Sequence, residues 1–256
     1  MQNNIFSGLF VGQNFFTLKE VDSTNKFLKE LLSNSTPVTE GTVIMAESQY
    51  AGRGQQQNTW HAEPGKNLTF SILLKPDFLP VSNQFDLTRA VSLGVFDALA
   101  PLAGEKLKIK WPNDIYYRDN KMGGMLIENI IQYGTIKDAV VGIGLNINQL
   151  SFPVHLTKAI SLIQILHRDY DLKTLLSDIC AKIESHYLAL KAGKTAFVRD
   201  SYLNRLYWLN EQREFKTKNG PFKGRIKTVR DNGLLVVQNN NGAELEFSFK
   251  EIEFLY

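Results

Sequence analysis

The sequence predicts an α+β fold, in which helices flank a mixed β-sheet and a small C-terminal β-barrel follows. Up to about residue 207, strand-like and helix-like segments alternate, and each is long enough to bury one face in a common core. Beyond that point turn-forming residues recur about every ten residues between short apolar runs, without helical periodicity. We therefore divide the chain into residues 1–207 and residues 208–256.

The order of the predicted elements follows from capping residues and apolar spacing. Asp22-Ser23-Thr24-Asn25 offers helix-capping residues ahead of leucines at helical spacing. Strands are predicted where β-branched and apolar residues gather, over residues 41–48, 67–75, 106–117, 121–131 and 136–146. Further helices are predicted where apolar residues form a stripe, over residues 86–103, 153–170, 172–192 and 195–207.

Composition narrows the class of protein. The formal net charge of +3 over 256 residues is too balanced for a general polyanion binder, so no nucleic-acid partner is expected. The single cysteine, Cys180, excludes an internal disulfide framework and fits a reducing compartment. The sequence shows neither a signal-peptide pattern nor a run of about eighteen apolar residues, so we expect a cytoplasmic protein without a membrane partner.

A glycine-rich loop, residues 49–57, lies between two predicted strands. Gly52 and Gly54 let the backbone approach a ligand closely, and their amide N–H groups can meet an anion. Arg53 between them is a forked donor suited to a carboxylate or a phosphate. The same segment could be a plain surface hairpin, although long polar loops between strands often act as lids.

A predicted hairpin brings two lysines, an aspartate and a glycine pair together. Lys110 and Asn113-Asp114 lie on its first strand or just past a proline, and Lys121 begins the second strand. A lysine beside phosphorus offsets negative charge as it develops, and Asp114 could hold that lysine, bind Mg²⁺ or accept a proton. Gly123-Gly124 leaves room for a ligand. The alternative is a surface ion pair that contributes at most about 1 kcal/mol.

Two further segments could reach the same site. Ser23-Thr24-Asn25 has more polar groups than a helix cap needs, so the spare groups could bind a neutral ligand such as a ureido group. Gly142 and Gly144 within a strand indicate a bulge or the close approach of a ligand, and Asn146 could touch a phosphate or end the strand. The four histidines lack ligand-like spacing, so we expect no fixed protein cage for a metal.

Taken in order, these segments resemble the biotin–protein ligases over roughly residues 16–150, and the tail after residue 207 resembles that family's SH3-like domain. The matching pieces are Asp22-Ser23-Thr24-Asn25, Gln49 to Gly54, Trp60, Lys110-Trp111-Pro112-Asn113-Asp114, Lys121-Met122-Gly123-Gly124 and Gly142 to Asn146.

The resemblance implies an ATP-dependent biotin–[acetyl-CoA-carboxylase] ligase. In this family the biotin carboxylate attacks ATP, with Mg²⁺, to give biotinyl-5′-AMP, and a lysine of a biotin carboxyl carrier domain then takes the biotin. The implied partners are biotin, ATP and the carrier protein, while monomer and homodimer both stay open.

The resemblance also implies residue roles. Lys121, Arg53 and Asp114 would act in catalysis. Biotin and its adenylate would be bound by Ser23, Thr24, Asn25, Gln49, Gly52, Arg53, Gly54, Gln55, Trp60, Lys121, Gly123 and Gly124. The ATP phosphates and Mg²⁺ would be served by Lys110, Asn113, Asp114 and Asn146.

The chain departs from the family pattern in two places. The family commonly continues the glycine loop with basic residues and another glycine, whereas residues 55–58 are Gln-Gln-Gln-Asn, so we expect weaker retention of the adenylate. Too few residues precede Val21 for the winged helix-turn-helix that some members use to repress transcription, which again argues against DNA binding.

Two other functions stay open at this point. A lipoate or octanoate transferase of the same superfamily would need an apolar tunnel, whereas Ser23-Thr24-Asn25 and the C-terminal barrel favour biotin. A non-catalytic module that senses biotinyl-AMP would have no need of Arg53, Asp114 and Lys121 together. The ligase function requires that Arg53 and Lys121 converge on one cavity.

Overall fold

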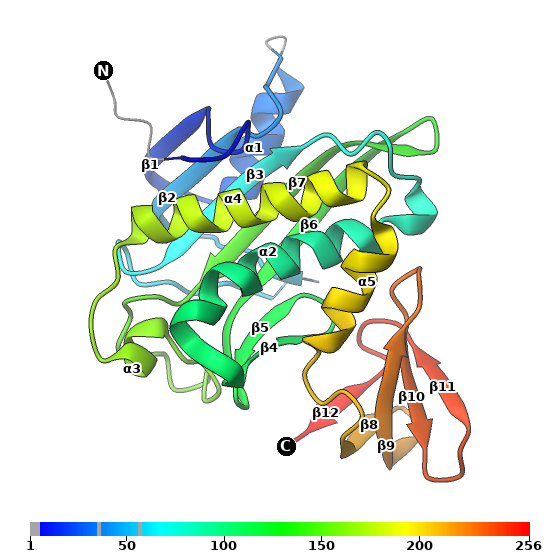
Figure 1. The fold of residues 1–256 in the computed structure, drawn as a ribbon. Coiled ribbons are helices and arrows are strands. Elements are labelled where there is room, and N and C mark those ends of the chain that lie inside the picture. Colours follow the sequence, from blue (N-terminus) through cyan, green and yellow to red (C-terminus); the bar gives the residue numbers. More distant parts are fainter. Residues whose placement is uncertain (1–5, 35–36, 56–57) are drawn as a thin grey trace.

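A seven-stranded mixed sheet is the centre of the larger of the protein's two parts (Figure 1). The structure, a computed structural model, describes residues 6–34, 37–55 and 58–256. The strand order is β1-β2-β3-β7-β6-β5-β4; β1 and β2 pair in parallel and the other neighbours are antiparallel. The strands are β1 (Phe15–Val21), β2 (Val43–Gln49), β3 (Leu68–Leu74), β4 (Leu107–Lys110), β5 (Asp114–Tyr117), β6 (Asn120–Gln132) and β7 (Thr135–Leu145).

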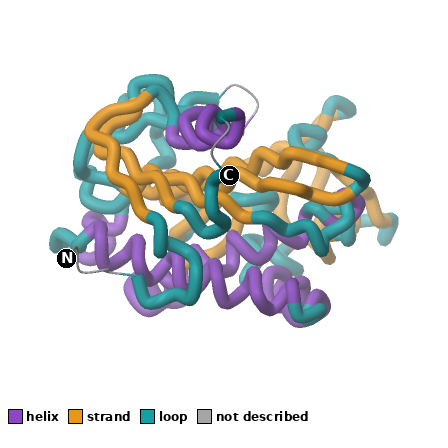
Figure 2. Tube along the Cα trace, turned by 90° about the horizontal axis from the view of Figure 1, so that it is seen from above, coloured by secondary structure: helices purple, strands orange, loops and turns teal. Residues whose placement is uncertain are grey.

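Helices lie on both faces of this sheet, as the view from above shows (Figure 2). On one face, α2 (Phe85–Ala103) and α4 (Leu172–Lys191) cover the main core, to which β3 contributes Leu68, Phe70, Ile72 and Leu74. On the other face, α1 (Thr24–Ser33) covers a smaller core of Leu28, Ile44, Leu73 and Val140. The short helices α3 (Leu162–Leu166) and α5 (Thr195–Asn204) and the 3-10 turns η2 (Val81–Asn83) and η3 (Gly104–Lys106) complete this part.

The face under α1 leaves room for a ligand. Side chains alternate across a strand, so Gly142 and Gly144 of β7 lie on the same face as Val140. Because these positions are glycines, Asn25 of the first turn of α1 and the Trp60 ring can lie close to the sheet there. The candidate site lies on this stretch of sheet.

A five-stranded antiparallel sheet follows, in the order β11-β10-β9-β8-β12 (Figure 1). Its strands are β8 (Gln212–Thr217), β9 (Gly220–Val229), β10 (Leu235–Asn239), β11 (Glu244–Phe247) and β12 (Glu253–Leu255). The predicted fold class, a mixed sheet with flanking helices and a small C-terminal SH3-like β unit, is confirmed. The exact division at residue 207 stays a prediction.

A buried arginine fixes the small sheet to the large one. Arg89 of α2 is 1% exposed; it pairs with Asp86 at 2.5 Å and donates to the carbonyl oxygens of Val229 (3.1 Å) and Arg230 (2.6 Å). Trp111 donates its Nε1–H to the Gly233 carbonyl oxygen at 2.9 Å, beside this contact. Removing one partner of such a buried charge costs about 3–5 kcal/mol, so these bonds hold the β9–β10 turn firmly.

Two predicted elements were wrong. Residues 106–117 form two strands rather than one, because Trp111-Pro112-Asn113, with a cis peptide bond before the proline, turns the chain between β4 and β5. Residues 153–170 contain only the short helix α3. The preceding stretch runs beside β6 instead, where Lys121 N–H donates to Lys158 and Ile160 N–H donates to Lys121. Tertiary pairing overrides local helical spacing there.

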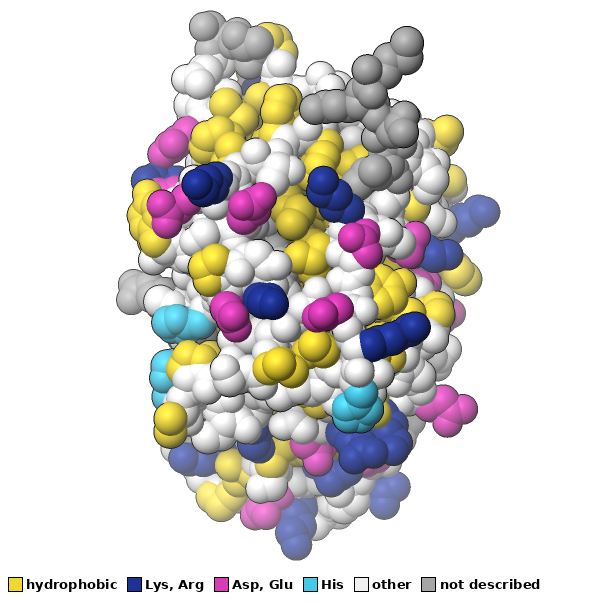
Figure 3. All heavy atoms as spheres, turned by 90° about the vertical axis from the view of Figure 1, so that its left-hand side faces the viewer, with side chains coloured by type: hydrophobic (Ala, Val, Ile, Leu, Met, Phe, Trp, Pro, Cys, Tyr) yellow, Lys and Arg dark blue, Asp and Glu magenta, His cyan; other side chains and the backbone are white. Residues whose placement is uncertain are grey.

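The longest apolar helix is packed inside the protein, and polar and charged side chains lie on the surface. Val81–Lys106 is long and apolar enough to cross a membrane, but 61% of its most apolar window is buried in the protein, as in a core helix. Gly94 within it lets α4 approach closely, since a Cβ there would lie 2.6 Å from Ile183. On the face shown in Figure 3, basic and acidic side chains are interspersed with apolar ones over most of the surface.

Candidate active site

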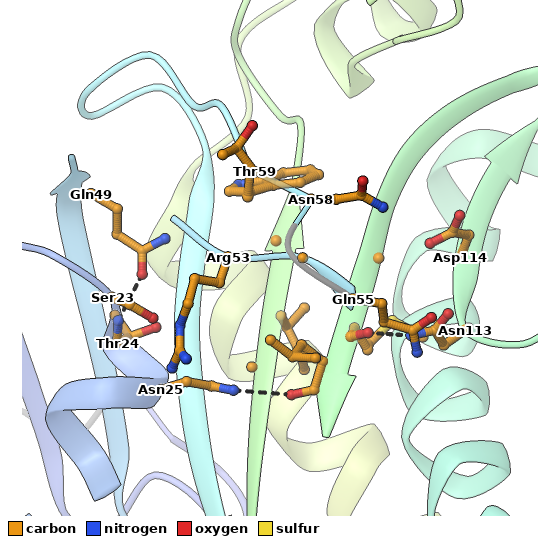
Figure 4. A pocket seen from close by; sticks show the side chains of 18 of the residues that line it. Ser23, Thr24, Asn25, Gln49, Arg53, Gln55, Asn58, Thr59, Asn113 and Asp114 are labelled. Carbon is orange, nitrogen blue, oxygen red and sulfur yellow. Dashed lines mark hydrogen bonds between the residues drawn. The ribbon is translucent and has the colours of Figure 1, made fainter. Parts of the chain in front are cut away.

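Arg53 and Lys121 line one cleft on the α1 face of the sheet, so the two cations share a single cavity. Figure 4 shows Arg53 and Asp114 in this cleft. Most of the predicted site residues line the same cleft: Ser23, Thr24, Asn25, Gln49, Arg53, Gly54, Gln55, Trp60, Asn113, Asp114, Lys121 and Gly124. Four predicted residues lie elsewhere in the described structure: Gly52, Lys110, Gly123 and Asn146.

The start of α1 forms the neutral polar end of the cleft. Ser23 is the N-cap, yet its side chain makes no capping hydrogen bond, so the hydroxyl is not used by the helix. Thr24 N–H donates to Gln49 Oε1 at 2.7 Å, which fixes the Gln49 amide beside the helix start. Ser23, Thr24 and Asn25 are all buried. Buried polar groups need hydrogen-bond partners, so this end suits an uncharged polar ligand group.

Three glycines form the floor of the cleft. A Cβ on Gly142 would lie 2.3 Å from Asn25 Oδ1, and one on Gly144 would lie 2.5 Å from the Trp60 ring. On Gly124 it would lie 2.6 Å from Asp114 Oδ1. Each glycine therefore makes space for a side chain of the site. Gly123 has the opposite orientation, toward Leu145, and serves the packing of the sheet.

Lys121 and Asp114 face each other across the β5–β6 hairpin. Lys121 Nζ lies 2.7 Å from Asp114 Oδ1, and the two side chains are 38% and 24% exposed, so both reach the cleft. Asn113 donates its Nδ2–H to the Met125 carbonyl oxygen, which ties the turn before β5 to β6. The hairpin thus presents a fixed cation and a carboxylate at one point.

Arg53 enters the cleft from the glycine loop and points toward Asn25 (Figure 4). Its Nη2 lies 3.4 Å from Glu128 Oε2, a weak contact that leaves most of its donors free. Gly52 is buried in the loop, where a Cβ would meet the Trp60 carbonyl oxygen at 2.5 Å and Gln49 Nε2 at 3.2 Å. Gln55 lines the cleft, while Gln56 and Gln57 lie outside the described residues.

A second cavity adjoins the cleft and shares Thr59, Trp60 and Lys121 with it. Asn146 lines this cavity, together with the aromatic rings of Trp60, Phe152 and His155. The Trp60 Nε1–H donor and the Asn146 Oδ1 acceptor are buried without a hydrogen-bond partner. The aromatic rings of this lining suit a planar heterocycle.

Lys110 does not reach the cleft. Its ammonium lies among three aromatic rings, 4.7 Å from the centroids of Tyr116 and Phe254 and 5.1 Å from that of Tyr256, whose hydroxyl lies 2.6 Å away. Burial there lowers the pKa of Lys110 to about 8. Lys110 contacts the C-terminal strand β12, but the cavity that it lines shares Asp114 and Phe249 with the cleft, so its contact with a phosphate stays a prediction.

Comparison with known proteins identifies the family. Residues 17–146 match the model of the biotin/lipoate A/B protein ligase family, which is about half of the chain. The chain belongs to this family. The bifunctional ligase/repressor BirA of Bacillus subtilis is 29% identical over 241 residues, which cover 93% of this chain and 73% of that protein.

A second sequence relative and a solved structure are also similar to this chain. The biotin–[acetyl-CoA-carboxylase] ligase of Mycobacterium tuberculosis is 32% identical over 133 residues, 51% of this chain and 48% of that protein. The solved biotin protein ligase of Aquifex aeolicus, in complex with biotin and ATP, is 27% identical with a TM-score of 0.78, covering 94% of this chain and 98% of that one. The predicted family is confirmed.

Several residues at this family member's site were missed from its sequence, and three of them show why. Ser71 of β3 lies between Thr24 and Asn25, Glu128 of β6 contacts Asn25 and Arg53, and Phe249 reaches the cleft from the C-terminal unit. A serine or a glutamate that alternates with apolar residues in a strand usually has no role beyond the sheet, so neither Ser71 nor Glu128 indicates a site from the sequence. Phe249 is distant in sequence, and only its tertiary placement reveals it.

Proposed function

We propose that this family member is a biotin–protein ligase, which activates biotin with ATP to biotinyl-5′-AMP and transfers biotin to a lysine of a carboxyl carrier domain. The observation that carries the proposal is the convergence of Arg53, Lys121 and Asp114 on one cleft between a neutral polar end and an aromatic cavity. An acid and a nucleotide would meet where the two cavities share Lys121.

Biotin would occupy the end of the cleft at α1. Its ureido group is neutral and carries both N–H donors and a C=O acceptor, which matches the buried hydroxyls of Ser23 and Thr24 and the half-buried amide of Gln49. The apolar side chains Met125, Leu126 and Ile143 would contact the rest of the molecule. This polar end favours biotin over a linear fatty acid, whose chain has no groups to pair with these donors and acceptors.

The adenine of ATP would occupy the aromatic cavity. Its ring would lie against the aromatic rings of Trp60, Phe152 and His155, which line this cavity together with Asn146. Asn146 would then contact the base rather than the phosphates. This assignment places the α-phosphate near Lys121, which lines both cavities.

The first step would join the two substrates at phosphorus. A biotin carboxylate oxygen attacks the α-phosphorus, the bond from that phosphorus to the α–β bridging oxygen breaks, and pyrophosphate leaves. Lys121 and Arg53 would offset the negative charge that grows on the phosphoryl oxygens, and donors held in place for this purpose contribute strongly to rate. The loop that carries Arg53 would also keep water away from the mixed anhydride.

Mg²⁺ would be held by Asp114 together with the ATP phosphates. Among the residues that the structure describes, there is no group of three or more His, Cys, Asp or Glu side chains placed to hold a metal ion. A magnesium ion bound with nucleotide phosphates needs only one or two protein carboxylates, and Asp114 reaches the cleft. When bound, the ion would offset phosphate charge.

In the second step, a lysine amine of the carrier attacks the biotinyl carbonyl carbon, an amide bond forms and AMP leaves. A lysine has a reference pKa near 10.4, so only about one in two thousand is neutral at pH 7. Asp114 would accept the proton that the incoming ammonium must lose, since it is the carboxylate nearest Lys121 in the cleft.

Mass spectrometry of a carrier domain tests the function. After incubation with this protein, ATP, Mg²⁺ and biotin, the carrier should gain the mass of one biotin, and Lys121→Ala should abolish the gain. Lys218→Ala is the matched control, because Lys218 is exposed in the C-terminal unit. A parallel reaction with lipoic acid should leave the carrier unmodified. An unchanged carrier with biotin, or a lipoyl adduct, would contradict the proposal.

A further inference from the structure

Glu128 of β6 joins three side chains near the biotin end of the cleft. Its carboxylate accepts hydrogen bonds from Asn25 Nδ2 at 2.8 Å and Lys29 Nζ at 2.6 Å, and it lies 3.4 Å from Arg53 Nη2. Partial burial favours the protonated form, but the hydrogen bonds from Lys29 and Asn25 outweigh it and lower the pKa of Glu128. The group is therefore an ionised carboxylate, which can only accept hydrogen bonds.

The Asn25 amide takes its orientation from two acceptors. Its Nδ2 faces both the Glu128 carboxylate and the Leu126 carbonyl oxygen, which lies 3.1 Å away. Only the NH₂ end of the amide can bond to both, so the oxygen end must point the other way. That oxygen, Oδ1, lies 2.7 Å from Ser71 Oγ. Asn25 is 3% exposed, so water does not compete for these contacts.

The order of donors then continues to Thr24. Ser71 Oγ lies 2.7 Å from both Asn25 Oδ1 and Thr24 Oγ1, but a hydroxyl has one proton to donate. Asn25 Oδ1 cannot donate, so Ser71 must donate to it, and Thr24 must donate its own proton to Ser71. Thr24 Oγ1 is left with a lone pair for a ligand, and Thr24 lines the cleft.

We propose that Glu128 is a positioning residue that sets the direction of this hydrogen-bond chain, so that Thr24 accepts a hydrogen bond from a ligand N–H. The inference rests on the proposed function, because the ureido group of biotin supplies that N–H. Gln49 complements it: its Oε1 accepts from Thr24 N–H, so its NH₂ group is left to donate to a carbonyl oxygen. A cyclic urea offers the matching N–H and C=O side by side.

Biotin affinity, measured by calorimetry, tests the role of Glu128. Glu128→Met removes the acceptor and should weaken biotin binding about tenfold, whereas Glu128→Gln keeps an acceptor oxygen and should stay within about twofold of wild type. Glu30→Met is the matched control on α1, since Glu30 is 62% exposed and pairs only weakly with Lys26 at 3.6 Å. ATP affinity should be unchanged in all three.

A double-mutant cycle with Thr24→Val separates positioning from a general structural effect. If Glu128 acts through Thr24, Glu128→Met should cost less than about twofold once Thr24 is already valine. Independent, additive losses in the cycle would overturn the inference. A wild-type protein that does not bind biotin would instead refute the proposed function, and equal affinity of wild type and Glu128→Met would refute this inference alone.

A second pair of variants keeps the test available if Glu128→Met does not fold. Asn25→Asp places a carboxylate against Glu128 and should weaken biotin binding, because two acceptors then face each other. Adding Glu128→Gln to Asn25→Asp supplies a donor toward that aspartate and should restore part of the affinity, since the Leu126 carbonyl oxygen still faces it. Failure of the second change to restore binding would overturn the inference.

Discussion

Lys121 Nζ lies 2.7 Å from Asp114 Oδ1, directly over Gly124, where a Cβ would come within 2.6 Å of that carboxylate oxygen and 3.2 Å of the ammonium. The pair can rest on the sheet only because the residue beneath it has no side chain. Both groups are partly exposed, so the pair contributes at most about 1 kcal/mol to folding. Its arrangement is explained better by the reaction than by stability.

Asp114→Asn removes the negative charge of this residue but keeps its size and its hydrogen-bond acceptor, so it tests the charge alone. The amide can still accept a hydrogen bond from Lys121, so the free energy of unfolding should change by less than about 1 kcal/mol. Loss of the charge should slow biotin transfer about a hundredfold, since the incoming lysine loses its proton acceptor. Transfer from preformed biotinyl-AMP to the carrier measures this step alone. Wild-type rates of both adenylation and transfer would count against a chemical role for Asp114.

Alanine in place of two floor glycines should affect different substrates. Gly142→Ala would press on Asn25 Oδ1 and should weaken biotin binding, while Gly144→Ala would press on the Trp60 ring and should weaken ATP binding. We expect about a tenfold loss in each case, because overpacking costs about 1–3 kcal/mol. Each variant is the control for the other, and calorimetry measures the affinity of both variants for biotin and for ATP. Equal losses of both ligands in both variants would refute the division of the cleft.

Gln55→Arg should slow the release of biotinyl-AMP. Gln55 lines the cleft next to Gly54 but carries no charge, so an arginine would add a cation facing the adenylate. Release into solution can be followed by chromatography of the adenylate after a single turnover. Gln132→Arg, at the exposed end of β6, adds the same charge away from the cleft and should release at the wild-type rate. Equal release from all three proteins would show that residue 55 does not retain the adenylate.

Because of Lys110, the free energy of unfolding should depend on pH in the alkaline range. Burial lowers its pKa from 10.5 to about 8, so above pH 8 the unfolded chain binds more protons at this residue than the folded protein does. The free energy of unfolding should therefore rise with pH, by about 1 kcal/mol between pH 8 and 9.5, and Lys110→Met should remove that rise. Above about pH 10 the free energy of unfolding should stop rising, because the raised pKa of Tyr256 acts in the opposite direction. Urea unfolding across this range measures the slope, and identical slopes in the two proteins would contradict the prediction.

The sequence predicted those elements whose own residues decide their structure. The alternating row on β3 and the leucine stripe of α4 bury the faces expected of them, and the glycine loop and the β5–β6 hairpin meet as their polar residues suggested. Strand β1 was missed, because its largely exposed residues gain strand structure mainly by pairing with β2. Residues 153–170 were predicted as helix although their partner is β6, which no local pattern can show.

The same limit applies within the site. Arg53, Asp114 and Lys121 carry charge in glycine-rich or turn contexts, and this combination is visible in a sequence. Lys110 has similar local signals, yet Phe254 and Tyr256, more than a hundred positions away, enclose it in the aromatic cage. Distant partners therefore decided which of the predicted cations serves the cleft.

The attachment of Arg89 to the β9–β10 turn affects how this protein can be shortened or recombined. A chain cut after α5 would leave the Arg89 guanidinium without the carbonyl oxygens of Val229 and Arg230, and Trp111 Nε1–H without the carbonyl oxygen of Gly233. The C-terminal unit is therefore not a detachable module for protein engineering. A chimera that replaces it should carry over the receiving turn, residues 229–233, along with whatever strands are exchanged.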